Sequence, residues 1–386
     1  AQDWLVLQLT NSPLDVGITT ALQFLPILLF GLLGGLVIDR YPKRTILLVT
    51  QAIMGLLAAT LAALTLTGVI TVWHIYLIAF TLGMVTVVDN PTRQVFVNEL
   101  VPANLVRNAV SLNTATFQLA RLVGPAVAGL LIAATGSGWA FAINALSFAA
   151  TIGALLAMRT DLLGKLPHAS RHSGQLREGL RYVMARPHIL WTIVLVFFIG
   201  TFGYNFSVYL SAYAKNVFDS GADIYGLLNT ALALGSISGA ILAARRATVR
   251  LRFLFGVAAA FSASMVALGF TPSMLAFMGV LVLCGLASTS FSTTANASVQ
   301  LASDARVRGR VMSLYVMVFM GGTPIGGPIA GAITDKLGAP TAMITGGAIC
   351  LAATIGCAAL AARQTGTRLP TSLHAHADQR PVLLHH

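Results

Sequence analysis

Long runs of apolar residues follow one another along almost the whole chain, and they limit its possible folds more than any other feature. Each run is close to the roughly 20 residues that a helix needs to cross the hydrocarbon core of a bilayer. After a partial run that ends near Leu9, the runs lie at 17–38, 45–66, 72–88, 109–133, 138–157, 189–209, 225–244, 253–270, 273–291, 311–333 and 341–361. The sequence therefore predicts twelve membrane-spanning helices, the first of them truncated at its start.

Composition excludes a soluble domain and a membrane barrel. The 386 residues are 56% apolar and 9% charged, whereas soluble domains carry about 25% charged residues. Strands of outer-membrane barrels alternate apolar and polar residues over about ten positions, and these runs are continuous and about twice as long. We therefore expect an all-α membrane protein.

The basic residues predict how the chain is oriented. If the connection after the second run is inside, 21 of the 24 Lys and Arg residues lie on inside segments, and only Lys215 and Lys336 lie outside. Loops rich in Lys and Arg stay on the cytoplasmic side. We expect a multi-pass protein of the inner (cytoplasmic) membrane with both termini cytoplasmic. The same rule explains the net charge of +12 without a nucleic-acid partner.

Side chains that could hold a metal or a cofactor are scarce. Cys284, Cys350 and Cys357 lie inside apolar runs without metal-ligand spacing, as small buried residues do. Histidines in the polar tail after Arg363 could bind metal, but a solvated tail is the simpler explanation. The chain has no G-x-x-x-x-G-K-[ST] phosphate loop. Transport driven by ATP would therefore need a separate ATPase subunit. We expect neither metal nor cofactor.

An internal repeat relates the fifth run to the eleventh. Four pairs of small residues align at a constant offset of 202: Gly124 with Gly326, Ala128 with Ala330, Gly129 with Gly331, and Gly136 with Gly338. Chance matching is the alternative, since small residues are common in membrane helices. A true repeat predicts two six-helix bundles related by a pseudo-twofold axis along the membrane normal.

Four parts follow from these observations. Residues 1–158 form an N-terminal six-helix bundle with an incomplete first helix, and residues 188–362 form a C-terminal six-helix bundle. Residues 159–187 form a cytoplasmic linker, in which 176–184 place apolar residues at helical spacing opposite basic ones. This pattern predicts an amphipathic interfacial helix, with an ordinary solvated linker as the alternative. Residues 363–386 are expected to be a disordered cytoplasmic tail.

Four motifs resemble a known transporter family. Residues 35–44 read GLVIDRYPKR and resemble the G-x-x-x-D-R-x-G-R-R loop of the major facilitator superfamily, with Pro42 in place of the usual Gly. Residues 121–129 read RLVGPAVAG and resemble the Gly-Pro motif of its proton-coupled exporters, here Gly124, Pro125 and Gly129. Residues 89–94 and 308–314 read DNPTRQ and RGRVMSL. They resemble the branch that includes siderophore (enterobactin) exporters and macrolide efflux proteins.

The resemblance implies a secondary transporter whose two bundles rock around a central site, and it places a latch at their cytoplasmic ends. Asp39 can face the N-terminus of the eleventh helix near Val311, where a carboxylate gains about 0.3–1 kcal/mol. Gly35, one turn earlier, allows a close approach. This contact would hold the two bundles closed on the inside.

Further charges belong to the same expected latch. Arg40 or Arg44 can pair with Asp89, and Arg93 lies one turn beyond Asp89. The alternative is that these exposed charges only set the topology.

Arg121 lies about halfway along the fifth run, where an Arg costs about 2.5–3.5 kcal/mol on insertion scales. We therefore expect it to face a central cavity, together with Asn113 and Gln118 of the same run, because such transporters bind substrate near the midplane. A structural buried ion pair is the alternative.

Asp3 is the acid that we expect to act with Arg121. It would lie roughly 9 Å below the outer surface, and Arg121 about 9 Å deeper, so the two could meet only if both side chains extend. We expect Asp3 to exchange a proton for its contact with Arg121 or with substrate. An Asp near the membrane surface is the alternative.

Aromatic and polar groups in the second half predict a substrate-binding wall. Tyr204, Asn205 and Tyr209 lie on the seventh run and Ser288 on the tenth. Such a lining suits a bulky, partly aromatic solute, although most aromatic residues in a span pack or face lipid.

The sequence therefore predicts a monomeric, proton-coupled exporter of a small amphiphilic or aromatic solute, such as a drug or a siderophore. A pH-independent facilitator, an importer or a lipid flippase of the same fold is the first alternative. A membrane-embedded enzyme or receptor is the second, and it would need clustered His, Glu or Asp residues at midplane.

Overall fold

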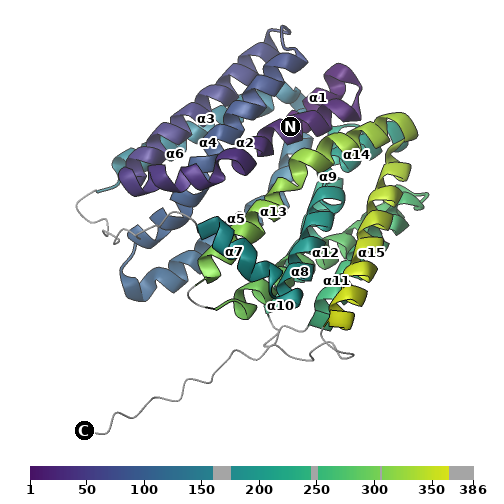
Figure 1. Ribbon diagram of the computed structural model, residues 1–386. Coiled ribbons are helices and arrows are strands. Elements are labelled where there is room, and N and C mark those ends of the chain that lie inside the picture. Colours follow the sequence, from purple (N-terminus) through teal and green to yellow (C-terminus); the bar gives the residue numbers. More distant parts are fainter. Residues whose placement is uncertain (160–174, 245–250, 305–306, 365–386) are drawn as a thin grey trace, which may run out of the picture.

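The computed structural model describes residues 1–159, 175–244, 251–304 and 307–364, and in these ranges the chain is helical without strands (Figure 1). The N-terminal half comprises α1 (Gln2–Thr10), α2 (Pro13–Arg40), α3 (Lys43–Leu66), α4 (Val72–Glu99), the short turn η1 (Ala103–Leu105), α5 (Val106–Thr135) and α6 (Ser137–Ala157). The helix α7 (Gln175–Met184) follows, and then the C-terminal half comprises α8 (Pro187–Phe198), η3 (Ile199–Gly203), α9 (Phe206–Ala212), η4 (Tyr213–Val217), α10 (Ala222–Ala244), α11 (Leu251–Gly269), α12 (Met274–Ala302), α13 (Arg308–Gly321), α14 (Thr323–Leu337) and α15 (Ala339–Gln364).

These helices confirm an all-α membrane protein. Among the described residues, 11 helical segments are long and apolar enough to cross a membrane. The nine-residue helix α1 precedes them and is apolar apart from a few polar side chains. The expected spans are all found, and the differences concern where they end and whether they are continuous.

Two helices continue well past the ends predicted from hydropathy. α4 runs to Glu99 rather than to residue 88, and α12 runs to Ala302 rather than to residue 291. Hydroxyl groups in both extensions bond to the carbonyl four residues earlier, as Thr92 does to Val88 at 2.6 Å. Hydropathy marks where a helix leaves the apolar layer, whereas the backbone hydrogen bonds continue beyond it.

The seventh and eleventh spans are interrupted. The seventh extends to Val217 and contains two π-helical stretches, η3 and η4. The eleventh is divided into α13 and α14 at Gly321 and Gly322, and Pro324 lies in the first turn of α14. π-helical turns occur frequently at functional sites, and η3 leads directly into the cavity described below.

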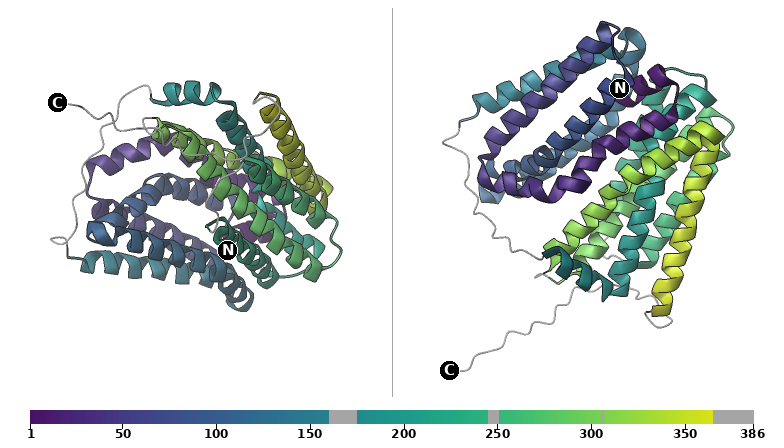
Figure 2. Two further views of the ribbon diagram at one scale, coloured as in Figure 1. Left: turned by 90° about the horizontal axis from the view of Figure 1, so that it is seen from below. Right: turned by 45° about the horizontal axis from the view of Figure 1, so that its top comes forward.

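The helices form two bundles that meet at one end and spread apart toward the other (Figure 2). In the N-terminal bundle α2 packs on α4 and α3 on α6, and in the C-terminal bundle α10 packs on α12 and α11 on α15. The largest contacts between the bundles are α2 with α14 and α5 with α10. We call the end where they meet the closed end; the helix ends found there are Pro13, Thr135, Ala222 and Leu337. The opposite, arginine-rich end holds the helix ends Arg40, Val106 and Arg308.

The two bundles repeat the same structural detail at the closed end. Gly136 follows the last residue of α5 with φ 85° and ψ 164°, and Gly338 follows the last residue of α14 with φ 86° and ψ 157°. Each glycine donates its N–H to the carbonyl four residues back, Ile132 and Thr334, at 2.8 and 3.0 Å. A positive φ is readily accessible only to glycine. The aligned glycines therefore terminate equivalent helices in the same way, as a true repeat requires.

The helix α7 occupies the part of the linker where an amphipathic helix is expected, and the structure places it against the C-terminal bundle. Just after it, Arg186 lies over the Tyr182 ring at 3.6 Å and pairs with Asp304 at 3.3 Å. The Tyr182 hydroxyl accepts a hydrogen bond from the Asp304 backbone at 3.0 Å. The remaining linker residues 160–174 and the expected tail from residue 365 onward lie outside the described residues.

Candidate functional site

A cavity of about 450 Å³ lies between the two bundles. Its walls come from both halves of the chain: Thr20 and Phe24 on α2; Arg121 and Pro125 on α5; Tyr204, Asn205, Phe206, Ser207 and Val208 at η3 and α9; Asn229, Leu232, Ala233 and Ser236 on α10; Ser288, Thr289 and Ser292 on α12; and Phe319, Met320 and Thr323 at α13 and α14. The lining combines hydroxyl, amide and aromatic groups with a single charged side chain.

That charged side chain is Arg121. It lies about 21 Å from either end of α5 at 1.5 Å per residue, which places it at the middle of the span. Its side chain is exposed in the cavity, and in the described part of the chain it forms no ion pair or hydrogen bond. The guanidinium group therefore has all of its donors available to a bound solute.

Asn205 and Tyr204 form the opposite wall, directly after η3. The Asn205 side chain is 3% exposed, and its amide nitrogen donates to the Thr201 carbonyl at 2.7 Å. Its Oδ1 atom is buried without a hydrogen-bond partner. The Tyr204 hydroxyl donates to the Ser288 carbonyl at 3.1 Å, which joins the seventh span to α12. An unpaired buried acceptor is costly, and Asn205 holds one in the cavity wall.

Four of the residues predicted to contact substrate therefore line one cavity: Arg121, Tyr204, Asn205 and Ser288. Asn113 is exposed on α5, Gln118 is half-buried there, and neither borders the cavity. Tyr209 is fully buried and donates to the Phe202 carbonyl at 3.2 Å, within its own span.

The sequence reasoning missed several polar residues of the cavity. Asn229 and Ser236 on α10 and Thr20 on α2 all lie in it. Asn229 and Ser236 are seven residues apart on an apolar helix, so they share a face. That spacing was a usable signal. No such signal marks Thr20, because an isolated hydroxyl can bond to its own helix. The Thr20 hydroxyl donates to the Val16 carbonyl at 2.9 Å.

A second cavity of about 430 Å³ continues toward the arginine-rich end, between α2, α4 and α13. It shares Met320 with the first, and none of its lining residues is charged. Met312 and Met317 supply flexible, polarisable walls, and Asn90 and Gln94 supply amides. The second cavity is thus an uncharged approach to the first, which has one positive charge.

Glycines bring the two bundles into close contact at the closed end. A Cβ on Gly17 of α2 would collide with the carbonyl of Gly327 on α14, and one on Gly331 would lie 2.7 Å from the Pro13 oxygen. Gly129 of α5 lies against α10 in the same manner. Pro125 borders both the cavity and this contact, whereas Gly124 has open space around it.

Side chains of α1 also reach across to the C-terminal bundle at the closed end. Asp3 accepts a hydrogen bond from the Tyr225 hydroxyl at 3.3 Å, and Trp4 stacks on the same ring at 5.8 Å. Lys215 donates to the Leu7 carbonyl at 2.7 Å. The expected contact of Asp3 with Arg121 is not formed among the described residues, because Asp3 faces Tyr225 outside the central cavity.

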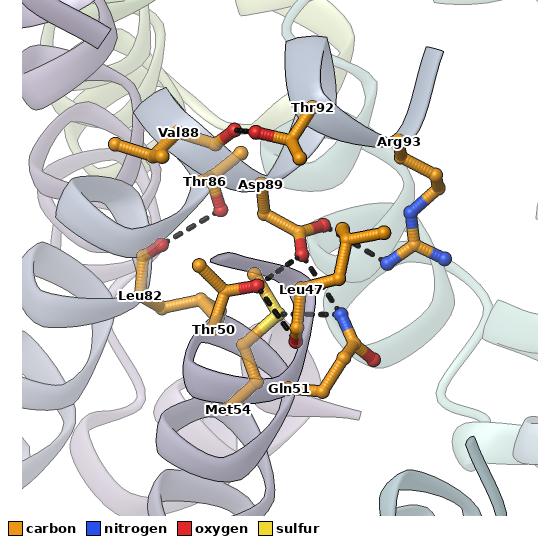
Figure 3. Close-up of polar contacts among 10 residues, drawn as sticks. All are labelled: Leu47, Thr50, Gln51, Met54, Leu82, Thr86, Val88, Asp89, Thr92 and Arg93. Carbon is orange, nitrogen blue, oxygen red and sulfur yellow. Dashed lines mark hydrogen bonds and ion pairs between the residues drawn. The ribbon is translucent and has the colours of Figure 1, made fainter. Parts of the chain in front are cut away.

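Asp89 is the most buried carboxylate in the described chain, at 2% exposure. It accepts hydrogen bonds from Thr50 at 2.6 Å and Gln51 at 2.9 Å, and it pairs with Arg93 at 2.9 Å (Figure 3). All four residues lie on α3 and α4 of the N-terminal bundle. The carboxylate therefore ties two helices of one bundle together rather than joining the two bundles.

Neither Arg40 nor Arg44 bridges the bundles among the side chains that the structure describes. Arg44 donates to the carbonyls of Leu155 and Leu156 at 2.7 and 3.0 Å, so the structure does not bring it together with Asp89. Arg40 is exposed at the end of α2. Gly35 and Asp39 lie in the last turns of α2, and the surroundings of their side chains lie outside the described part of the structure.

One acidic residue near the closed end was overlooked. Asp15, in the first turn of α2, accepts a hydrogen bond from the Tyr76 hydroxyl of α4 at 2.7 Å. It lies just before the apolar run on which the span was predicted, so hydropathy placed it outside the helix.

Comparison with known proteins agrees with this architecture. A family model described as "transmembrane secretion effector" matches residues 1–383. The multidrug efflux pump Tap of Mycobacterium tuberculosis is 26% identical over 404 residues, covering 98% of this chain and 92% of the pump. The enterobactin exporter EntS of Escherichia coli is 25% identical over 329 residues, covering 84% of this chain and 78% of the exporter.

Solved structures show the same fold. A mutant of the nucleoside transporter NupG superposes with a TM-score of 0.70 at 12% identity, covering 93% of this chain and 94% of NupG. These matches confirm the resemblance seen in the motifs and set aside the enzyme alternative. The chain belongs to the transmembrane secretion effector family of the major facilitator superfamily, and it is a multi-pass membrane transporter of small molecules.

Proposed function

We propose that the protein exports a small amphiphilic, partly aromatic solute by alternating access, as a proton-coupled antiporter. One observation carries the proposal: a cavity with polar and aromatic walls lies between two bundles that pack closely at one end and spread apart toward the other (Figure 2). The names of Tap and EntS, an efflux pump and an exporter, support the outward direction.

The arginine-rich end is the cytoplasmic end in this proposal. The C-terminus then lies on the cytoplasmic side of the inner membrane, and so does the N-terminus if a preceding segment completes the first span. The conformation described here is open to the cytoplasm. The distribution of Lys and Arg supports this orientation. The solute would enter through the uncharged second cavity and bind in the first.

The moving bodies are the bundles at 1–158 and 188–362, joined by the linker at 159–187. Opening to the outside would separate the glycine contacts of the closed end. It would also bring Asp39, Arg40 and Arg44 toward the start of α13, where the proposed latch would form. Each chain supplies both walls of its cavity, which supports a monomer as the working unit.

Asp3 is the proposed site of proton coupling. Its carboxylate accepts the hydrogen bond that joins α1 to Tyr225 of α10, so binding a proton would weaken a contact that holds the outer side closed. Lys215 reaches α1 from η4, and the Asp15–Tyr76 pair lies on the adjacent α2 and α4. None of these groups borders the central cavity, so the proton and the solute would use separate sites.

The test is efflux of small aromatic solutes from vesicles that contain the purified full-length protein, with and without an imposed pH gradient. We expect the gradient to accelerate efflux, and the Asp3→Asn variant to transport without responding to it. Transport that is indifferent to pH would favour a facilitator or a flippase instead. Asp3→Asn that keeps the full pH response would return Asp3 to a structural role.

A further inference from the structure

We infer that the central cavity is a binding site for an organic anion: an aromatic solute that carries a carboxylate or a similar oxyanion, together with a hydrogen-bond donor. The inference rests on the proposed transport function and specifies its substrate class. It follows from the charge, the hydrogen-bonding groups and the shape of the cavity.

The charge of the cavity is positive and uncompensated. Arg121 borders the cavity, and none of the cavity-lining residues is an acid. Three carboxylates of the described chain have partners outside the cavity: Asp3 with Tyr225, Asp15 with Tyr76, and Asp89 with Thr50, Gln51 and Arg93. An arginine at this depth is costly without a counter-charge. A bound anion would supply that counter-charge.

The chemistry of arginine narrows the anion further. A guanidinium group presents five N–H donors in a planar fork that matches a carboxylate or another oxyanion through two parallel hydrogen bonds. Arg121 is exposed to the cavity, and its donors form no hydrogen bond within the described part of the chain. The geometry therefore favours an oxyanion over a halide or a neutral carbonyl.

The opposite wall requires a donor from the solute. Asn205 is 97% buried, and its Oδ1 atom has no partner. The neighbouring Tyr204 hydroxyl already donates to Ser288, so it cannot satisfy that oxygen. In this conformation Oδ1 is closed off from the cavity, so the Asn205 amide must turn toward it before a hydroxyl or N–H of the solute can satisfy the oxygen. That contact would remove the cost of an unpaired buried acceptor.

The space between the Arg121 guanidinium and the Asn205 amide suits the aromatic part of a solute. Tyr204 and Phe319 lie at 5.6 Å between ring centroids in an edge-to-face arrangement, and Phe24 borders the cavity from α2. Edge-to-face and stacked contacts of this kind favour a further ring. The solute is thus anchored by its charge to α5 and by its donor to the seventh span, one on each bundle.

The decisive experiment compares three probes with the same aromatic body: naphthylacetate, naphthylacetamide and naphthylmethyl-trimethylammonium. Their binding to the purified full-length protein in lipid nanodiscs is measured by equilibrium dialysis. We expect naphthylacetate to bind more tightly than the other two by about 10- to 150-fold, the range for a hydrogen bond to a charged group.

Three variants separate a binding role from a structural one. Arg121→Gln should lower the affinity for naphthylacetate to that for naphthylacetamide, and it should leave the affinity for naphthylacetamide unchanged. Arg121→Lys should restore part of the preference for naphthylacetate. Arg252→Gln is the control, because it removes an exposed positive charge at the start of α11, outside the cavity. It should leave all three affinities unchanged.

Equal affinities for the three probes, including no detectable binding of any, would overturn the inference, as would an equal loss for all three in Arg121→Gln. The proposed transport function fails separately. If naphthylacetate binds selectively but no probe crosses a vesicle membrane, the anion site stands and export does not. If the cationic probe is exported and naphthylacetate does not bind, export stands and the anion site does not.

Discussion

Gly129 of α5 and Gly226 of α10 face each other across the two bundles at backbone contact distance. A Cβ built on Gly129 would lie 2.9 Å from the Gly226 Cα, and one built on Gly226 would lie 3.0 Å from the Gly129 Cα. No side chain fits between them. Together with the α2–α14 glycines, this pair makes the contact that distinguishes the closed end from the open one.

Gly129→Ala should push the closed end apart. The added methyl group would also lie 2.6 Å from the Ala222 carbonyl, and overpacking of this kind costs about 1–3 kcal/mol. We expect a shift toward the outward-open state, measured as faster labelling of single cysteines placed at the closed end.

Gly124→Ala, five residues earlier on the same helix, is the matched control for this change. Its Cβ would meet nothing within 4 Å, so labelling should remain that of the parent protein. Equal labelling of the two variants would show that the glycine contact does not hold the bundles together.

Lys215→Gln should weaken the contact between α1 and the C-terminal bundle at the closed end. Lys215 reaches the Leu7 carbonyl at 2.7 Å, and a charge-assisted bond is worth more than a neutral one. We expect faster labelling of closed-end cysteines in this variant. Lys336→Gln, which removes the exposed cation at the end of α14, should have no effect. The idea is wrong if both substitutions act alike.

Asp89→Ala should destabilise the N-terminal bundle more than Arg93→Ala does. The first change leaves the amide of buried Gln51 and the Arg93 guanidinium without their acceptor, at a cost of about 1–3 kcal/mol. The second removes a partner that is 49% exposed, and such pairs contribute about 0–1 kcal/mol. Thermal unfolding in detergent measures the difference. A larger loss for Arg93→Ala would mean that the ion pair, not the buried network, holds α3 to α4.

Asn205→Ala should remove a preference for hydroxylated solutes. If Oδ1 accepts a hydrogen bond from the solute, hydroxynaphthoate binds the parent protein more tightly than naphthoate by about 2- to 10-fold. In Asn205→Ala the two should bind alike, while the preference for carboxylate over amide persists. Equal binding of the two naphthoates to the parent protein would leave Asn205 no role in recognition.

The fold could be predicted because each apolar run is long enough to span a bilayer and each half repeats the other. Gly136 and Gly338 illustrate this, since a 202-residue offset seen in the sequence reappears as the same helix-ending geometry. The cavity could be predicted in part, because an arginine in the middle of an apolar run needs a polar environment. Arg121 has one in the central cavity.

The partners of charged residues could not be predicted in the same way. Asp89 bonds to Thr50 and Gln51 rather than to Arg44 because the α3–α4 packing brings these side chains together, and sequence spacing does not encode packing. The two π-helical stretches also shift the faces of the seventh span. Tyr209, which follows the first of these stretches, is buried within its own bundle and does not border the cavity.

The backbone contacts of the closed end have a consequence for the energetics of its opening. Glycine has no rotamers to lose on burial, so parting Gly129 from Gly226 or Gly17 from Gly327 releases no trapped side chain, and rejoining them orders none. The entropy of side chains thus contributes almost nothing to either direction at these points. These glycine contacts can therefore open and close repeatedly. The equilibrium between the closed and the open state is then set by the few polar contacts around the glycines and by the solute in the cavity.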